Sequence, residues 1–250
     1  MNLLIKRFYS KLYQLDILFK RRSRPKHVSH FESEDLENLF KKYSSREKIV
    51  VLCNGPSAKK ANVSPNNLYL VTNNGRDIFQ NNDFLYYVND GFYVKKILSR
   101  SNYLPKKQEI LFYYDSSISH KKGLRYLVRH LFLLKNKKIY FISDEFENYI
   151  SKLNNYIFTQ FYTEKKIPIK IQNSGVFLLL FGYFLATKMN KPLEIYGLDL
   201  GIGGAFHFDN KGVVGKSVID ERIKKNVKMY LDHIYKEKLY VQNFSNFYPN

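Results

Sequence analysis

The sequence predicts an α/β protein with a Rossmann-like, mostly parallel sheet flanked by helices, in a single domain with a short lid. Short apolar runs alternate with longer helix-like segments from residue 48 onward. The chain is 44% hydrophobic and 25% charged, which is typical of a globular protein and excludes a wholly disordered one. Its 250 residues are enough to bury a large core without disulfides.

The predicted strands are short segments rich in β-branched and aromatic residues. They are Ile49–Cys53, Leu68–Thr72, Phe84–Asn89, Ile110–Tyr114, Lys138–Ile142, Leu193–Gly197 and Leu239–Gln242. The predicted helices between them are Gly91–Arg100, Lys121–Leu134, Ser174–Lys188 and Ile219–Lys236. Residues 143–170 show no clear period, and no element is predicted there.

Residues 1–26 form a separate predicted segment, a basic amphipathic helix. Apolar residues recur at helical spacing along one stripe, at Leu4, Phe8, Leu12, Leu15 and Phe19. Such a helix suits an anionic membrane surface, although packing on the domain with a solvated basic face explains the pattern equally well. Residues 27–47 read as a linker or helix, and residues 48–250 as the domain, with a lid at about 200–217. No segment reaches the roughly 20 apolar residues that span a bilayer, and no signal peptide is recognised.

The charge of the chain limits its partners. Its 41 basic residues exceed its 22 acidic ones, a net charge of +19 that favours a membrane leaflet, a phosphorylated glycolipid, a nucleotide or a nucleic acid. Nucleic acid ranks last, because the basic residues follow no known nucleic-acid-binding pattern. The single cysteine, Cys53, excludes an intrachain disulfide and a multi-cysteine zinc site and indicates a reducing compartment. No metal-binding motif is recognised, so no metal is expected.

Asparagine recurs where predicted strands end. The first strand runs into Asn54, Gly55, Pro56 and Ser57, the second into Asn73 and the third into Asn89. In a parallel sheet, ligands bind at the carboxyl ends of strands. An amide can hydrogen-bond to a ligand without bearing charge, and Gly55 permits close approach of the backbone. Pro56 or Ser57 can open a helix whose N–H groups attract phosphate. Turn preference alone explains each residue singly.

The later strand ends carry further candidates. Asn173, Ser174 and Gly175 open the most apolar predicted helix, where Ser174 also suits a simple N-cap. Another strand runs into Gly197 and Asp199, followed by a glycine-rich loop that could act as a lid. Three titratable or charged side chains come after that loop: His207, Asp209 and Lys216.

These motifs together resemble bacterial sialyltransferases of glycosyltransferase family 42. The resemblance is carried by VLCNGPSAK, Thr72-Asn73-Asn74, Tyr-Val-Asn89, Asn173-Ser174-Gly175-Val176 and EIYGLDL, and covers roughly residues 48–245. It implies an inverting glycosyltransferase that uses CMP-activated sialic acid and needs no metal or other cofactor. By position it implies that Asn54, Asn73 and Asn89 contact the CMP-sugar. It likewise implies that Asn173 and Ser174 lie beside the nucleotide and that Gly197 and Asp199 close the cytidine pocket.

The catalytic half departs from the family. The family's histidine in a Gly-His-Ser triplet is replaced by Lys216, and the family's arginine is replaced by Ile171, while the lid is shortened. His207 is therefore the candidate base, because an unperturbed imidazole titrates near neutrality. Asp209 is the second candidate, and Lys216 is expected to neutralise phosphate. The alternative for His207 is a surface or lid histidine with no catalytic role.

The expected function is transfer of an acidic sugar, sialic acid or a related nonulosonate, from a CMP-sugar to a lipooligosaccharide or capsular glycan. The expected place is the cytoplasmic, inner face of the membrane, as a peripheral protein. Three alternatives remain: a Kdo transferase using CMP-Kdo, a non-catalytic nucleotide-sugar-binding protein, and a nucleic-acid-binding protein. The sequence leaves open whether the chain forms a homo-oligomer.

Overall fold

The computed structural model describes residues 28–31, 33–79, 84–88, 93, 96–97, 109–112, 138–142, 174–202, 221–237 and 240–249. Their helices are α2 (Ser33–Tyr43), α6 (Ser174–Met189) and α7 (Glu221–Lys236), with 3₁₀ helices η1 (Pro56–Lys60) and η2 (Asn73–Ile78). The strands are β1 (Val28–Phe31), β2 (Ile49–Leu52), β3 (Leu68–Thr72), β4 (Phe84–Tyr87), β5 (Glu109–Phe112), β6 (Lys138–Ile142), β7 (Leu193–Tyr196) and β8 (Val241–Asn243).

The chain forms two compact units. The first contains Met1–Leu36 and Leu85–Ser143, and the second contains Glu37–Phe84 and Asp144–Asn250. In the first unit the strand order is β1-β6-β5-β4, and these neighbours pair in parallel. Leu85, Tyr86 and Ile110 are fully buried there, as is typical of parallel strands covered on both faces.

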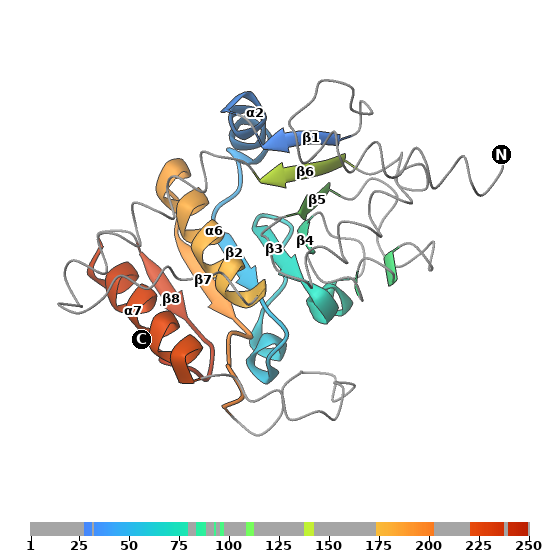
Figure 1. The fold of residues 1–250 in the computed structure, drawn as a ribbon. Helices are drawn as coiled ribbons and strands as arrows, with labels where there is room; N and C mark the ends of the chain where they lie inside the picture. Colours follow the sequence, from blue (N-terminus) through green and yellow to red (C-terminus); the bar gives the residue numbers. More distant parts are fainter. Residues whose placement is uncertain are drawn as a thin grey trace. The chain divides into compact units, whose positions relative to one another are not determined.

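The strands of the second unit run β3-β2-β7-β8, again all in parallel. Val51 of β2 lies between Leu70 of β3 and Ile195 of β7. From β2 the chain continues to β3 on one side, whereas from β7 it continues to β8 on the other (Figure 1). The direction of winding therefore reverses between β2 and β7, which makes this point the switch point of the second unit.

Helix α6 covers one face of these strands. It packs on β2, β3 and β7, and Figure 1 shows it lying across them. Twelve of its sixteen residues are buried, which explains why its sequence is apolar all round rather than amphipathic. Helix α7 packs beside α6, with the Tyr183 ring edge-on to His233. The amphipathic pattern of α7 fits this position at the margin of the core.

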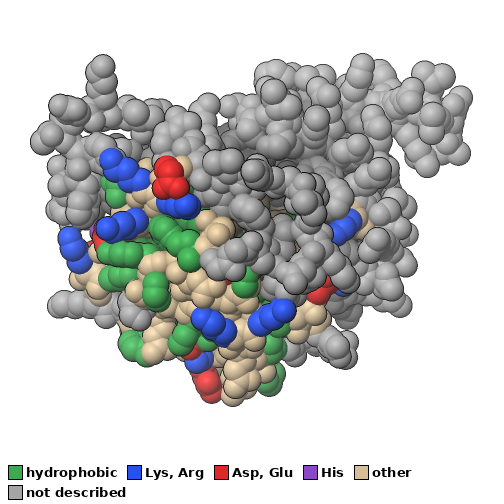
Figure 2. Space-filling view, turned by 90° about the horizontal axis from the view of Figure 1, so that it is seen from below, with side chains coloured by type: hydrophobic (Ala, Val, Ile, Leu, Met, Phe, Trp, Pro, Cys, Tyr) green, Lys and Arg blue, Asp and Glu red, His purple; other side chains and the backbone are tan. Residues whose placement is uncertain are grey.

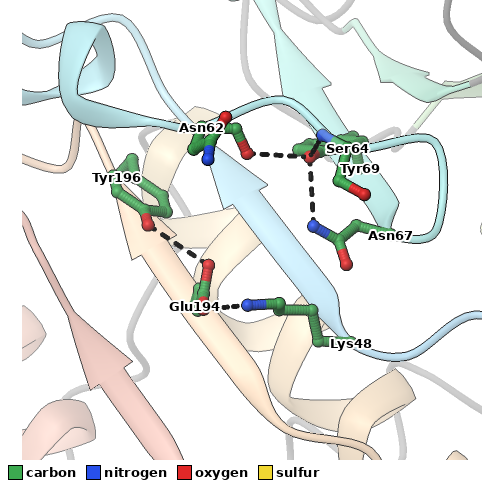
Figure 3. Close-up of polar contacts among 7 residues, drawn as sticks. All are labelled: Lys48, Asn62, Ser64, Asn67, Tyr69, Glu194 and Tyr196. Carbon is green, nitrogen blue, oxygen red and sulfur yellow. Dashed lines mark hydrogen bonds and ion pairs between the residues drawn. The ribbon is translucent and has the colours of Figure 1, made fainter.

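The opposite face of the same strands carries polar and aromatic side chains (Figure 3). Lys48 Nζ lies 2.6 Å from Glu194 Oε1, and the Tyr196 hydroxyl donates to Glu194 Oε2 at 3.2 Å. On β3, the Tyr69 hydroxyl donates to the Asn62 carbonyl and accepts the Ser64 N–H. The strand residues alternate with those that face α6, as the two-residue period of a strand requires.

The predicted α/β fold, a parallel sheet flanked by helices, is confirmed, and each predicted strand corresponds to an observed one. The single domain with a short lid stays a prediction. Two elements, β1 and α2, lie in the segment predicted as a linker or helix. The element after β2 is the five-residue η1 and not a regular helix, and β8 extends to Asn243. The predicted N-terminal helix and the helix at 121–134 lie outside the described residues, as do most of the lid and of the helix at 91–100. No helix of the described part is long and apolar enough to cross a membrane.

Candidate functional site

The carboxylate of Asp199 is the centre of the candidate site. Asp199 follows β7 and is 1% exposed. Its Oδ2 accepts the Ser57 N–H at 2.7 Å, and its Oδ1 accepts the Ser57 hydroxyl and the Asn246 N–H, both at 2.6 Å. Three donors of this kind satisfy a buried carboxylate. Asp199 therefore connects the segments that follow β2, β7 and β8.

Further hydrogen bonds join the same segments. The Ser57 hydroxyl, while donating to Asp199, accepts the Gly197 N–H at 2.8 Å. The Gly55 N–H donates to the Gly197 carbonyl at 2.8 Å, and the Leu198 N–H donates to Ser245 Oγ at 3.0 Å. Buried backbone groups near the strand ends are thus paired. These hydrogen bonds hold the segments after β2, β7 and β8 together at the carboxyl ends of the strands.

Two glycines make this close approach sterically feasible. A Cβ on Gly55 would lie 2.3 Å from Asp199 Oδ2 and 2.7 Å from the Gly197 carbonyl oxygen. Gly197 has a φ of +74°, and its Cβ would lie 2.6 Å from the Cys53 carbonyl oxygen. Both positions therefore require glycine for contacts within the protein. This requirement is independent of any ligand.

Asn54 is a candidate ligand-binding side chain at the end of β2. It follows β2, is 8% exposed, and its Oδ1 accepts the Gly75 N–H at 3.0 Å. Its Nδ2 has no hydrogen-bond partner among the described residues, so both amide hydrogens remain available as donors. Asn73, with a φ of +52°, opens the turn that carries Gly75. The loops after β2 and β3 are thereby held together.

The start of α6 reaches the same edge of the sheet. The Cys53 thiol lies 4.0 Å from the Gly175 carbonyl oxygen, measured from Sγ. The first N–H groups of a sixteen-residue helix carry partial positive charge and attract anions. Burial, and secondly the Asp199 carboxylate, raise the pKa of Cys53. The Cys53 thiol is therefore buried and protonated, as is typical of a cysteine that packs in a core.

The predicted site residues divide into three groups. Hydrogen bonds or steric contacts bring together Gly55, Ser57, Gly197 and Asp199, while Asn54 directly precedes Gly55 and accepts the Gly75 N–H. The chain itself places three more at this edge, because Asn73 precedes Asn74 and Gly75 while Ser174 and Gly175 begin α6. The remaining five lie outside the described residues: Asn89, Asn173, His207, Asp209 and Lys216.

Sequence reasoning missed the contribution of the last strand. Ser245 and Asn246 bind the loop after β7, and Asn243 Oδ1 accepts the Ser245 N–H at 3.0 Å. A signal was present, because the run Asn243-Phe244-Ser245-Asn246 repeats the Asn and Ser pattern of the other strand ends. The last strand was predicted to end at Gln242, so that run was not recognised as a strand end.

Comparison with known proteins identifies no relative. No protein family, no curated protein and no solved structure matches the chain. Among the described residues, no group of three or more His, Cys, Asp or Glu side chains is arranged to hold a metal ion. The function is therefore inferred from the geometry of the site and from the sequence.

Proposed function

We propose that the chain is a CMP-sugar-dependent glycosyltransferase that transfers sialic acid or a related nonulosonate to a lipooligosaccharide or capsular glycan. The observation that carries the proposal is the position of Asn54 at the switch point between β2 and β7. Ligands of open parallel sheets bind at that position, outside the carboxyl ends of the strands. The sequence motifs at this edge also resemble those of family 42 sialyltransferases.

The edge offers donors suited to a nucleotide phosphate. The Asn54 Nδ2 carries two hydrogens that have no acceptor among the described residues, and the N-terminal turn of α6 adds partial positive charge. Such groups stabilise the charge that develops on a departing phosphate in the transition state. Asp199 is a positioning residue in this scheme, because its oxygens already accept three donors within the protein.

The proposed transfer is a direct displacement of CMP by an acceptor hydroxyl. An acceptor hydroxyl attacks the anomeric carbon, the bond from that carbon to the phosphate oxygen breaks, and CMP departs with the bonding electrons. The hydroxyl proton passes to a base, for which His207 is proposed first and Asp209 second. Lys216 is proposed to pair with the phosphate. In this proposal, side chains and a helix N-terminus neutralise the phosphate charge without a metal.

The direct test of donor binding is calorimetry and thermal shift with the full chain. We expect CMP and CMP-linked sugars to bind and to raise the melting temperature, and UDP- and GDP-linked sugars to have no effect. CMP-sialic acid and CMP-Kdo are compared, because both donors are acidic CMP-sugars. The absence of any CMP affinity would reject the proposal.

Residues 1–26 are proposed to bring the enzyme to the cytoplasmic leaflet, where its glycolipid acceptor resides. In liposome flotation, the full chain should float with vesicles containing anionic lipid, and Phe8→Glu should abolish flotation. Phe8→Leu, which keeps the apolar stripe, should float like the natural chain. Equal flotation of Phe8→Glu would show that this helix does not bind membrane.

A non-catalytic nucleotide-sugar-binding protein is the second candidate function. It is favoured by the lysine at position 216, where the family carries its catalytic histidine. A binding protein would bind CMP-sugar and leave it intact with every glycolipid acceptor tested. Release of CMP that depends on His207 would decide for the enzyme.

A further inference from the structure

An exposed aromatic ring follows β8, in the segment whose next residues, Ser245 and Asn246, bind the loop after β7. Phe244 directly follows β8 and stacks on Tyr196, with ring centroids 4.7 Å apart and planes inclined by 11°. Tyr196 is only 7% exposed, whereas Phe244 is 36% exposed. Phe244 therefore has one face packed on Tyr196, and its other face is the one that can be open to solvent. The hydrogen bond from the Tyr196 hydroxyl to Glu194 holds the Tyr196 ring in place.

The segment that follows Phe244 carries polar groups. Asn246, two residues further on, donates its N–H to Asp199, and its Oδ1 accepts Lys60 Nζ at 3.3 Å. The Asn246 Nδ2 remains a donor, and Lys60 is exposed with no ion pair among the described residues. Figure 2 views the molecule from below, the side toward which β2 and β7 point in Figure 1, and shows Lys and Arg together with Asp and Glu among hydrophobic and uncharged side chains.

We propose that this cluster, Phe244 with Asn246 and Lys60, is the subsite for the base end of the nucleotide. The base stacks on the open face of Phe244, the Asn246 amide bonds to its polar edge, and Lys60 approaches the phosphate. The inference rests on the proposed function and extends it to base recognition. Aromatic side chains bind nucleobases by such stacking, and an amide NH₂ group donates to the acceptors of a base. A single ring of this size suits a small planar ligand better than a macromolecular partner.

The absence of tryptophan from the sequence allows a direct test. Phe244→Trp gives the full chain its only indole, whose fluorescence responds when a base stacks on it. We expect CMP to quench that fluorescence and ribose 5-phosphate, which lacks a base, to leave it unchanged. Tyr240→Trp is the matched control, because Tyr240 is 57% exposed at the opposite end of β8. Its fluorescence should not respond to CMP.

Affinity measurements make the test independent of the fluorescent variant. Phe244→Ala should bind CMP about ten- to hundredfold more weakly than the natural chain, the effect typical of losing one base–aromatic stack. Phe244→Leu still covers Tyr196, and its affinity for CMP should fall by a similar factor. That result would show that disturbed packing is not the cause of the weaker binding. Binding of ribose 5-phosphate should be unchanged in both variants.

The outcomes separate this inference from the proposed function. If the natural chain binds CMP, and Phe244→Leu binds it equally well, the subsite is wrong and the proposed function stands. Unquenched fluorescence of Phe244→Trp at saturating CMP would overturn the subsite in the same way. If the natural chain does not bind CMP, both proposals are rejected.

Discussion

A single carboxylate, Asp199, joins three segments that are far apart in the sequence. Its partners are Ser57 and Asn246, and its own position follows from the turn after β7. Leu200 has a φ of +48°, and the Ile202 N–H closes the turn on the Asp199 carbonyl at 2.9 Å. This left-handed backbone conformation is unfavourable for Leu200, because the residue carries a β-carbon. The surrounding hydrogen bonds hold that conformation.

Asp199→Asn should destabilise the protein by about 2–4 kcal/mol. The reason is that the amide cannot accept at both positions, so its Nδ2 hydrogens would face the donors of Ser57 or Asn246. Urea denaturation measures the loss. Asp77→Asn is the control, because Asp77 is exposed and pairs with the adjacent Arg76, and it should change stability by less than about 0.5 kcal/mol. Equal effects of the two variants would contradict the structural role of Asp199.

His233 should make stability depend on pH. Burial against α6 lowers its pKa, outweighing the opposite effect of Glu237, while Lys236 adds to the lowering. The unfolded chain therefore binds the proton more readily, so stability is full above about pH 6.5 and is lost as the pH falls below it. The melting temperature of the natural chain should fall more steeply between pH 7 and 5 than that of His233→Gln. Parallel curves would show that His233 does not contribute.

At the scale of elements, α6 packs closely against β2. Gly182 faces Val51, and a Cβ there would lie 2.4 Å from Val51 Cγ2. The helix therefore approaches the strand more closely than any larger residue permits, and the apolar sequence of α6 is explained by burial.

Gly182→Ala should destabilise the protein by about 1–3 kcal/mol through overpacking, although alanine is the better helix former. The double variant Gly182→Ala with Val51→Ala should recover part of the loss, because the methyl group that clashes is gone. Thr187→Ala, at an exposed position of the same helix, is the control. It should be nearly neutral, because the higher helix propensity of alanine offsets the lost hydrogen bond from the Thr187 hydroxyl to the Tyr183 carbonyl. Additive losses in the double variant would contradict the contact.

Periodicity predicted most elements because buried strands and α6 have a strong apolar signal. The strand β1 and helix α2 were harder to predict. The strand is only four residues long, and the sequence VSHF has no uninterrupted apolar run. The element after β2 was expected to be a helix because proline often opens one, but η1 ends after five residues at Ala61, in extended conformation. Local propensity does not determine where such a short helix stops.

At the scale of the whole molecule, the pairing of β2 with β7 creates the candidate site. Sequence reasoning predicted that Asn54 and Asp199 lie at strand ends, because both follow recognisable strands. It could not predict that these strands are neighbours, since 140 residues separate Gly197 from Ser57, its hydrogen-bond partner. For the same reason, the contribution of Ser245 and Asn246 was not predicted. Long-range pairing depends on topology, which short motifs do not specify.

The central claim is most directly tested by the CMP affinity of Asn54→Asp, measured by calorimetry on the full chain. This variant keeps an oxygen for the Gly75 N–H but removes the Nδ2 donor and adds a charge that repels phosphate. Asn62→Asp, which adds the same charge at an exposed loop position, is the control. The account predicts that Asn54→Asp remains folded and loses CMP binding, whereas Asn62→Asp binds like the natural chain. Undiminished CMP binding by Asn54→Asp would contradict it.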